Sequence, residues 1–170
     1  MTIEVDGMVV LERAIAMALK IHTGQKDKAD NPYILHPLEV MQNVMHLGTS
    51  YATVGVLHDA IEDRDESLSA SKALDTIRRE VGLYSEEEAA LVAITKGFFS
   101  KHESRKQYLK RVAENEIAFQ VKIRDLHHNQ DLSRFGDDVH DYHVLGRALY
   151  LEEEAFLITH RVRFEQQNAE

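Results

Sequence analysis

The interpretation of this chain starts from residues 57–63, which read LHDAIED. In a helix, at about 100° per residue, His58 and Glu62 share one column of side chains, and Asp59 and Asp63 share the next. The apolar residues of the segment fall on another side and can pack into a core. Four ionisable groups so close together would repel one another if buried alone. A divalent cation would offset that repulsion, so the segment points to a metal site.

Two further segments supply matching donors. His36 stands directly before Pro37, a residue that suits the first turn of a helix. Asp125 and Asn129 are four positions apart and share a helix face, with Lys122 one turn before Asp125. A histidine at a helix entrance, an adjacent His-Asp pair and a distant aspartate form a mixed nitrogen and oxygen set. Such a set suits manganese, iron, magnesium or zinc and leaves room for water.

Helical signals dominate the rest of the chain. Both of its prolines lie within residues 31–37, and no clear period-2 strand pattern is present. A polar loop is expected at residues 22–35. Helices are predicted at residues 9–21, from Pro37 to near Gly48, at 51–63, at 67–80, from a capping box of Ser85 and Glu88, at 103–113, at 116–132 and at 141–164. The sequence therefore predicts an all-α fold, a compact multi-helix bundle.

Composition limits the function classes. The 170 residues suit one domain, which we expect to span residues 1–170. The absence of cysteine excludes disulfides, thiolate metal sites and cysteine nucleophiles. A net charge of −9 argues against a general nucleic-acid binder. No signal-peptide pattern or long apolar run is present, so we expect a cytoplasmic protein without a membrane partner, and a homo-oligomer stays open.

Four segments carry a resemblance to a known family. They are HTGQ at 22–25, PYILHP at 32–37, LHDAIED at 57–63 and KIRDLHHN at 122–129. Their order resembles the HD superfamily of metal-dependent phosphohydrolases. The finer pattern is similar to the hydrolase domain of the RelA/SpoT homologues, especially the single-domain small alarmone hydrolases. The resemblance implies an HD-domain helical bundle.

The resemblance also implies roles for particular residues. It implies four metal ligands, usually for manganese (Mn²⁺): His36, His58, Asp59 and Asp125. It implies Glu62 and Asp63 as the acidic pair that works on water, and Asn129 as a substrate contact. We expect Lys122 to hold phosphate oxygens. The implied reaction removes the 3′-pyrophosphate of ppGpp-type alarmones, giving GDP or GTP and pyrophosphate.

The sequence departs from the family at one place. Family members usually carry an Arg-Lys pair two and three residues after the position of Gln25, where this chain has Asp27 and Lys28. That arginine helps to hold the guanine base, and an aspartate cannot stack on a base as a guanidinium can. Asp27 could instead accept hydrogen bonds from a purine edge. We therefore place Asp27 and Lys28 at the substrate and leave the base open. Because the chain ends where fused members begin a synthetase domain, no alarmone synthesis is expected.

Two other functions stay in play. One is an HD phosphohydrolase acting on another nucleotide, such as an adenosine alarmone, a nucleoside monophosphate or NADPH, and Asp27 supports it. The other is a nucleotide-sensing module without turnover. The intact pair of Glu62 and Asp63 argues against the sensing module, because pure binding has little use for two more carboxylates beside phosphates.

Several other charged residues have less distinctive patterns. A basic helical cluster is expected to be a solvated face, with a phosphate-binding rim as the competing interpretation: Arg105, Lys106, Lys110 and Arg111. His22 is expected to be a structural, hydrogen-bonded residue. His127 and His128 are expected to pack around the motif or to support its ligands. For His143 and the remaining histidines, a surface position is the default.

Overall fold

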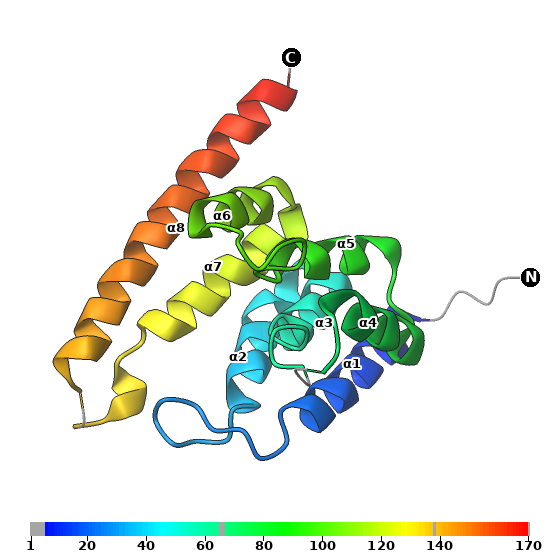
Figure 1. Ribbon diagram of the computed structural model, residues 1–170, viewed down its shortest axis with the longest axis horizontal. Helices are drawn as coiled ribbons and strands as arrows, with labels where there is room; N and C mark the ends of the chain where they lie inside the picture. Colours follow the sequence, from blue (N-terminus) through cyan, green and yellow to red (C-terminus); the bar gives the residue numbers. More distant parts are fainter. Residues whose placement is uncertain (1–5, 65–66, 138, 170) are drawn as a thin grey trace, which may run out of the picture.

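The computed structural model describes residues 6–64, 67–137 and 139–169, which form helices joined by loops and short turns (Figure 1). Within these ranges there are eight α-helices and no strand, only an isolated bridge between Lys26 and Pro32. The helices are α1 (Gly7–Ile21), α2 (Leu35–Val44), α3 (Thr49–Leu57), α4 (Ala70–Ile77), α5 (Ser85–Ile94), α6 (Arg105–Glu114), α7 (Glu116–Gln130) and α8 (Asp141–Asn168). The predicted all-α fold is confirmed.

Helices α2, α3 and α7 pack on one another, and α1 and α5 cover further sides of α3. Helix α8 runs along α6 and α7 at one flank of the molecule and continues past them to the C-terminus (Figure 1). Among the described residues, no helix is both long and apolar enough to cross a bilayer. The site discussed below lies where the ends of several of these helices meet.

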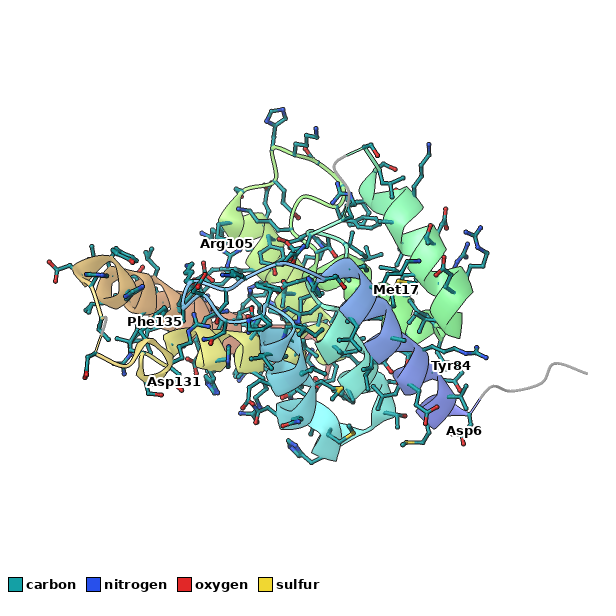
Figure 2. The ribbon with its side chains drawn as sticks, turned by 90° about the horizontal axis from the view of Figure 1, so that it is seen from below. Asp6, Met17, Tyr84, Arg105, Asp131 and Phe135 are labelled. Carbon is teal, nitrogen blue, oxygen red and sulfur yellow. The ribbon has the colours of Figure 1, made fainter. Side chains whose placement is uncertain are left out.

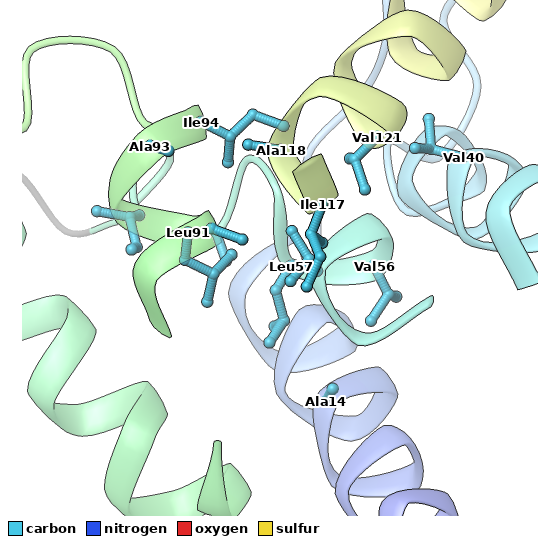
Figure 3. Close-up of a cluster of buried hydrophobic side chains, with 14 of the residues drawn as sticks. Ala14, Val40, Val56, Leu57, Leu91, Ala93, Ile94, Ile117, Ala118 and Val121 are labelled. Carbon is cyan, nitrogen blue, oxygen red and sulfur yellow. The ribbon is translucent and has the colours of Figure 1, made fainter. Parts of the chain in front are cut away.

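The core is built from small and branched apolar side chains. Figure 3 shows residues of α1, α3, α5 and α7 meeting there, with Leu57 close to Leu91 and Ile117. Leu57 and Leu91 are fully buried. Burying one such side chain stabilises the fold by about 1.5–3 kcal/mol. Because Leu57 is the last residue of α3, this packing fixes the point from which the next residue, His58, projects.

Close approach of α3 to α2 depends on Gly55. A Cβ atom built on Gly55 would lie 3.1 Å from the Cα of Met41 in α2, closer than nearly all such contacts in proteins. A side chain at position 55 would therefore require α2 to shift by a few tenths of an ångström, which glycine avoids. The consequence reaches the site, because His36 is carried by α2 and His58 follows α3 by one residue.

Helix α3 ends earlier than the predicted helix at 51–63. It stops at Leu57, and residues 58–63 form consecutive turns, in which the Asp63 N–H still donates to the Asp59 carbonyl at 2.9 Å. The side chains of this segment bond elsewhere, with Glu62 accepting from the Lys96 N–H at 2.6 Å. The regular helical columns expected for this segment are therefore wrong beyond Leu57.

Other helix boundaries also differ from the predictions, and α2 already begins at Leu35, two residues before Pro37. The cap of α5 is shifted by one residue, because Tyr84 is the N-cap and its N–H donates to the buried Glu87 carboxylate at 2.8 Å. Helix α4 spans fewer residues than predicted and passes into a π-helical turn over Arg78–Gly82. Helix α8 continues to Asn168, beyond the predicted end. Arg161, near that end, contacts the Ala113 carbonyl of α6 and the Phe119 ring of α7.

Candidate active site

Two imidazoles from different helices face each other. His36 in the first turn of α2 and His58 at the end of α3 are both almost fully buried, and their Nε2 atoms lie 3.2 Å apart. His58 Nδ1 lies 2.8 Å from the Gly55 carbonyl, so this nitrogen donates and carries the proton. A proton fixed on Nδ1 leaves the Nε2 lone pair available to a cation, which is how metal-binding histidines are usually oriented.

Two carboxylates complete the group. The Asp125 Oδ1 lies 3.1 Å from His36 Nε2 and 3.8 Å from His58 Nε2. The Asp59 Oδ2 lies 3.0 Å from His58 Nε2 and 3.6 Å from His36 Nε2. His36, His58 and Asp125 each offer a ligand atom within 4.8 Å of the others and form a group that could hold a metal ion. The carboxylate of Asp59 lies beside this group.

The donor chemistry of the group fits a divalent cation. Burial disfavours a charged carboxylate, but the positive groups around Asp125, led by Lys122, hold its pKa well below its usual value. Burial also opposes a charge on His58, yet Asp59 and Asp125 outweigh it and raise the pKa of His58. The surroundings thus favour a positive charge between the imidazoles and the carboxylates. A borderline divalent metal ion satisfies mixed nitrogen and oxygen donors of this kind.

The inner side chains are held by a second set of residues. The Tyr33 hydroxyl donates to Asp59 Oδ2 at 2.6 Å, and burial together with Asp59 raises the pKa of Tyr33, so the hydroxyl stays protonated. His128 Nδ1 lies 2.7 Å from Nδ1 of His36, on the side away from the cluster. The supporting role expected for His128 therefore matches its position. His127 instead contacts Glu154 on α8 at 2.8 Å.

Asp125 is fixed through both of its oxygens. Lys122 Nζ donates to Oδ2 at 2.6 Å, and Asn129 Nδ2 donates to Oδ1 at 2.5 Å. All three residues lie on one face of α7, as their spacing predicts. Lys122 and Asn129 were expected to contact substrate, and the structure shows that both also orient Asp125.

The side chains of the acidic pair, Glu62 and Asp63, point to different parts of the molecule. Glu62 accepts from the Lys96 N–H and is an exposed residue, but the protein around its carboxyl group partly desolvates it and raises its pKa. Asp63 points toward His22, with its Oδ2 3.5 Å from His22 Nδ1, and burial with the nearby Asp59 raises its pKa as well. Raised pKa values suit carboxylates that exchange protons near neutral pH. Neither side chain lines the cavity described next.

A cavity of about 320 Å³ opens onto the metal-binding group. Its lining comes from helices α2, α6, α7 and α8 and from the segments that follow α1, α3 and α7: Lys26, Asp27, Lys28, Tyr33, His36, Asp59, Arg105, Lys122, Asp125, Asn129, Arg134 and Tyr150. In Figure 2 the α1–α2 loop projects between Arg105, at the start of α6, and Phe135, after α7. The lining contains more basic than acidic side chains, although the whole chain carries a net charge of −9.

Asp27 and Lys28 both reach the cavity from the α1–α2 loop. Asp27 also shapes that loop, because its Oδ1 accepts from the N–H groups of Ala29 and Asn31 at 2.9 Å each. One oxygen of Asp27 is thus engaged inside the loop. Asp27 and Lys28 therefore belong to the cavity wall, and their contact with a substrate stays a prediction.

Sequence reasoning missed several residues of this region. Arg134 and Tyr150 line the cavity because the segment after α7 turns back and α8 packs over it, a tertiary arrangement without a motif in the sequence. Of the basic cluster, Arg105 lines the cavity but is bound by Glu153. Arg111 faces inward, bound to Glu103 at 2.7 Å and to the Ala93 carbonyl in the last turn of α5. The solvated face expected for the cluster is thus wrong for Arg111.

Two histidines illustrate the limits of default assumptions. His22 is buried, with Nδ1 2.8 Å from Gln25 Oε1, as expected for a structural residue. His143 was expected at the surface, but it is buried and stacks on Phe135 with ring centroids 3.8 Å apart. The aromatic ring of Phe135 explains the difference, because it offers an apolar platform under α8.

Comparison with known proteins shows that this chain is similar to one segment of several longer proteins. No protein-family model matches the chain. A GTP pyrophosphokinase from Streptomyces antibioticus is 31% identical over 139 residues, covering 78% of this chain and 16% of that protein. A probable guanosine-3′,5′-bis(diphosphate) 3′-pyrophosphohydrolase from Synechocystis sp. is 33% identical over 128 residues, covering 69% of this chain and 16% of that protein.

A shorter match is more similar. A guanosine-3′,5′-bis(diphosphate) 3′-pyrophosphohydrolase from Aquifex aeolicus is 38% identical over 64 residues, which is 36% of this chain and 9% of that protein. The chain spans about 16% of the length of the first relatives that it matches. These similarities support the resemblance to the RelA/SpoT homologues. The relatives are named for both pyrophosphokinase and pyrophosphohydrolase activities, so their names leave the direction of the chemistry open.

Proposed function

We propose that this chain is a RelA/SpoT-type hydrolase domain, which uses a divalent metal ion to remove the 3′-pyrophosphate of ppGpp-type nucleotides. The products would be GDP or GTP and pyrophosphate. One observation carries the proposal: His36, His58 and Asp125, which are distant in sequence, meet at a basic cavity. The relatives named as 3′-pyrophosphohydrolases support the same substrate class.

In this proposal the metal ion is manganese, held by His36, His58, Asp59 and Asp125. When bound, the ion would polarise a phosphoryl oxygen and lower the pKa of water. The residues of the chain supply the remaining functions. The two imidazoles and two carboxylates would hold the ion, and the burial of His36, His58 and Asp125 would shield it from bulk solvent.

Glu62 and Asp63 are the proposed acid and base. Both follow the His58-Asp59 pair by one turn, and both have raised pKa values. Both lie close enough to Asp59 and His58 for these charges to influence their pKa values, and either Glu62 or Asp63 would accept a proton from the attacking water. Asp63 would act from the side of His22, by holding the water or passing the proton outward.

Four residues are proposed to contact the nucleotide. Lys122 and Asn129 would hold phosphate oxygens next to Asp125, whose position they also fix. Lys28 would add a positive charge from the α1–α2 loop. Asp27 would accept hydrogen bonds from donors on the base edge, for which guanine offers N1–H and N2–H₂ and adenine offers N6–H₂.

The acidic side chain of Asp27 in the cavity wall favours one second candidate, hydrolysis of another nucleotide by the same machinery. An adenosine alarmone, a nucleoside monophosphate or NADPH would be the substrate. The cytoplasm, where such nucleotides occur, is the compartment that we propose for either activity.

A nucleotide panel tests the proposal. Purified protein with manganese would be incubated with ppGpp, pppGpp, pppApp, a nucleoside monophosphate and NADPH, while pyrophosphate and phosphate release are measured separately. We expect pyrophosphate from the 3′-diphosphates and its loss on chelation. If the nucleoside monophosphate were the one substrate hydrolysed, with release of phosphate, the alarmone assignment would fail and the chain would be a phosphohydrolase of another nucleotide. An incubation with GTP and ATP checks the pyrophosphokinase activity for which some relatives are named.

A further inference from the structure

The segment between α7 and α8 carries a guanidinium to the cavity. A short 3₁₀ turn, η3 (Ser133–Phe135), follows α7, and Asp131 shapes it by accepting from the Ser133 N–H at 2.9 Å. Figure 2 labels Asp131 and Phe135 at this junction. Arg134 lies between these two residues in the sequence, and it lines the cavity together with His36 and Asp125.

The side chain of Arg134 is held by an aromatic stack. Its Cζ lies 4.9 Å from the centroid of the Phe135 ring, within the range of a cation–π contact. The other neighbour of Phe135 is the buried His143 of α8, whose ring is nearly parallel to that of Phe135, at 20°. The guanidinium therefore rests on a packed platform, which lowers the entropy lost when it binds a ligand.

Most basic side chains that line the cavity already form ion pairs with carboxylates of this chain. Its lining contains five basic residues: Lys26, Lys28, Arg105, Lys122 and Arg134. Three of them form ion pairs, which are Lys26 with Asp30 at 2.8 Å, Arg105 with Glu153 at 2.5 Å, and Lys122 with Asp125 at 2.6 Å. Within the described part of the chain, Lys28 and Arg134 have no carboxylate in ion-pair range.

Arg134 also has an unused donor. Its Nε is buried and finds no acceptor among the residues that the structure describes. A buried donor without a partner costs about 1–3 kcal/mol, so such a group calls for an explanation. An anion in the cavity would provide the missing acceptor, and the fork of a guanidinium matches the oxygens of a phosphate.

We propose that Arg134 binds the 5′-phosphates of the nucleotide, the end of the substrate that is not cleaved. The inference rests on the proposed function, in which the 3′-diphosphate lies at the metal-binding group. The second phosphate group must then meet a cation elsewhere in the same cavity. Arg134 and Lys28 are the two basic residues whose charges are available, and Arg134 is the one held on a platform. Arg134 would thus set specificity for 3′-diphosphates that also carry a 5′-phosphate.

The test compares two substrates that differ only in the 5′-phosphates. These are ppGpp and guanosine 3′-diphosphate, measured with wild type, Arg134→Met and Arg134→Lys. We expect Arg134→Met to lower kcat/KM for ppGpp about ten- to a hundredfold, mainly through KM, because a charged hydrogen bond is lost. The value for guanosine 3′-diphosphate should stay within about threefold of wild type. Arg134→Lys should fall between, since it keeps the charge without the fork.

A binding measurement separates this inference from the proposed function. Calorimetric titration with GDP reports the 5′-diphosphate contact without turnover, and guanosine serves as the comparison ligand. Arg163→Met, an exposed change near the end of α8, controls for the loss of one positive charge. If neither substrate is hydrolysed but Arg134→Met weakens GDP binding tenfold or more, the inference stands and the hydrolase proposal fails. Equal losses for both substrates, or GDP binding that is absent or insensitive to Arg134→Met, would overturn the inference.

Discussion

The hydroxyl of Tyr33 donates to the carboxylate of Asp59 at 2.6 Å, across 26 positions of sequence. This contact connects the α1–α2 loop, which forms one wall of the cavity, to the residue beside the metal-binding group. It also holds Asp59 Oδ2 near His58 Nε2, at 3.0 Å. The loop that lines the cavity and the proposed ligands of the metal are therefore directly linked by this hydrogen bond.

Replacing Tyr33 by Phe tests that connection. The ring would still pack beside His22 and His36, so the fold should be retained. Loss of the hydroxyl frees Asp59, and manganese affinity should fall about 10- to 100-fold, the usual scale for a residue that orients a ligand. Metal titration and circular dichroism give the two readouts. Unchanged affinity would show that Asp59 needs no support or does not bind the metal.

Glu62→Gln tests the acid/base role. The glutamine carbonyl oxygen can still accept from the Lys96 N–H, so the turn should keep its conformation. Metal content should match wild type, while kcat should fall by about 10²-fold or more, because the proton acceptor is lost. The matched control is Glu80→Gln, whose carboxylate lies at the surface beside Lys20. Turnover close to wild type in Glu62→Gln would move this role to another residue, Asp63 first.

Asp27→Arg tests the choice of base. The ratio of kcat/KM for pppGpp to that for pppApp should rise, because a guanidinium can stack on the base and the acceptor for the adenine amine disappears. Asp27→Asn is the control for the loop, since its amide oxygen can still accept from the N–H groups of Ala29 and Asn31. A ratio that Asp27→Arg leaves unchanged would place this side chain outside the base pocket.

Glu87→Ala tests the fold rather than the site. Glu87 is 1% exposed, and its carboxylate caps α5 by accepting from the Tyr84 N–H. Removing it should lower the free energy of unfolding by about 1–3 kcal/mol, measured by urea denaturation. The neighbouring Glu88→Ala should change it by less than about 0.5 kcal/mol. Equal effects of the two substitutions would assign the cap to the wrong residue.

The sequence predicts the helical fold well, because its periodicity and turn residues act locally. The positions of His36, His58 and Asp125 could be anticipated as a group only through the motifs and their family resemblance. Local spacing failed just after Leu57, where contacts of Glu62 with the Lys96 backbone accompany turns in place of a helix. The assignment of a single domain over the whole chain stays a prediction.

The residues that the packing of α8 places at the cavity could not be predicted from local sequence patterns. Arg134 and Tyr150 reach the cavity through packing of this helix on α6 and α7, and nothing in their local sequence marks them. The burial of His143 against Phe135 has the same origin. Residues placed by long-range packing, rather than by a motif, are those that the sequence left unassigned.

The central claim is that a metal ion at the His36 and His58 pair drives release of pyrophosphate from ppGpp. The most direct test is pyrophosphate release during manganese titration of metal-free protein, for wild type and His58→Ala, with the exposed His46→Ala as control. Wild type and His46→Ala should gain activity up to one manganese ion per chain, while His58→Ala should neither bind the ion nor release pyrophosphate. Full metal binding and turnover by His58→Ala, or metal-independent release by wild type, would contradict the account.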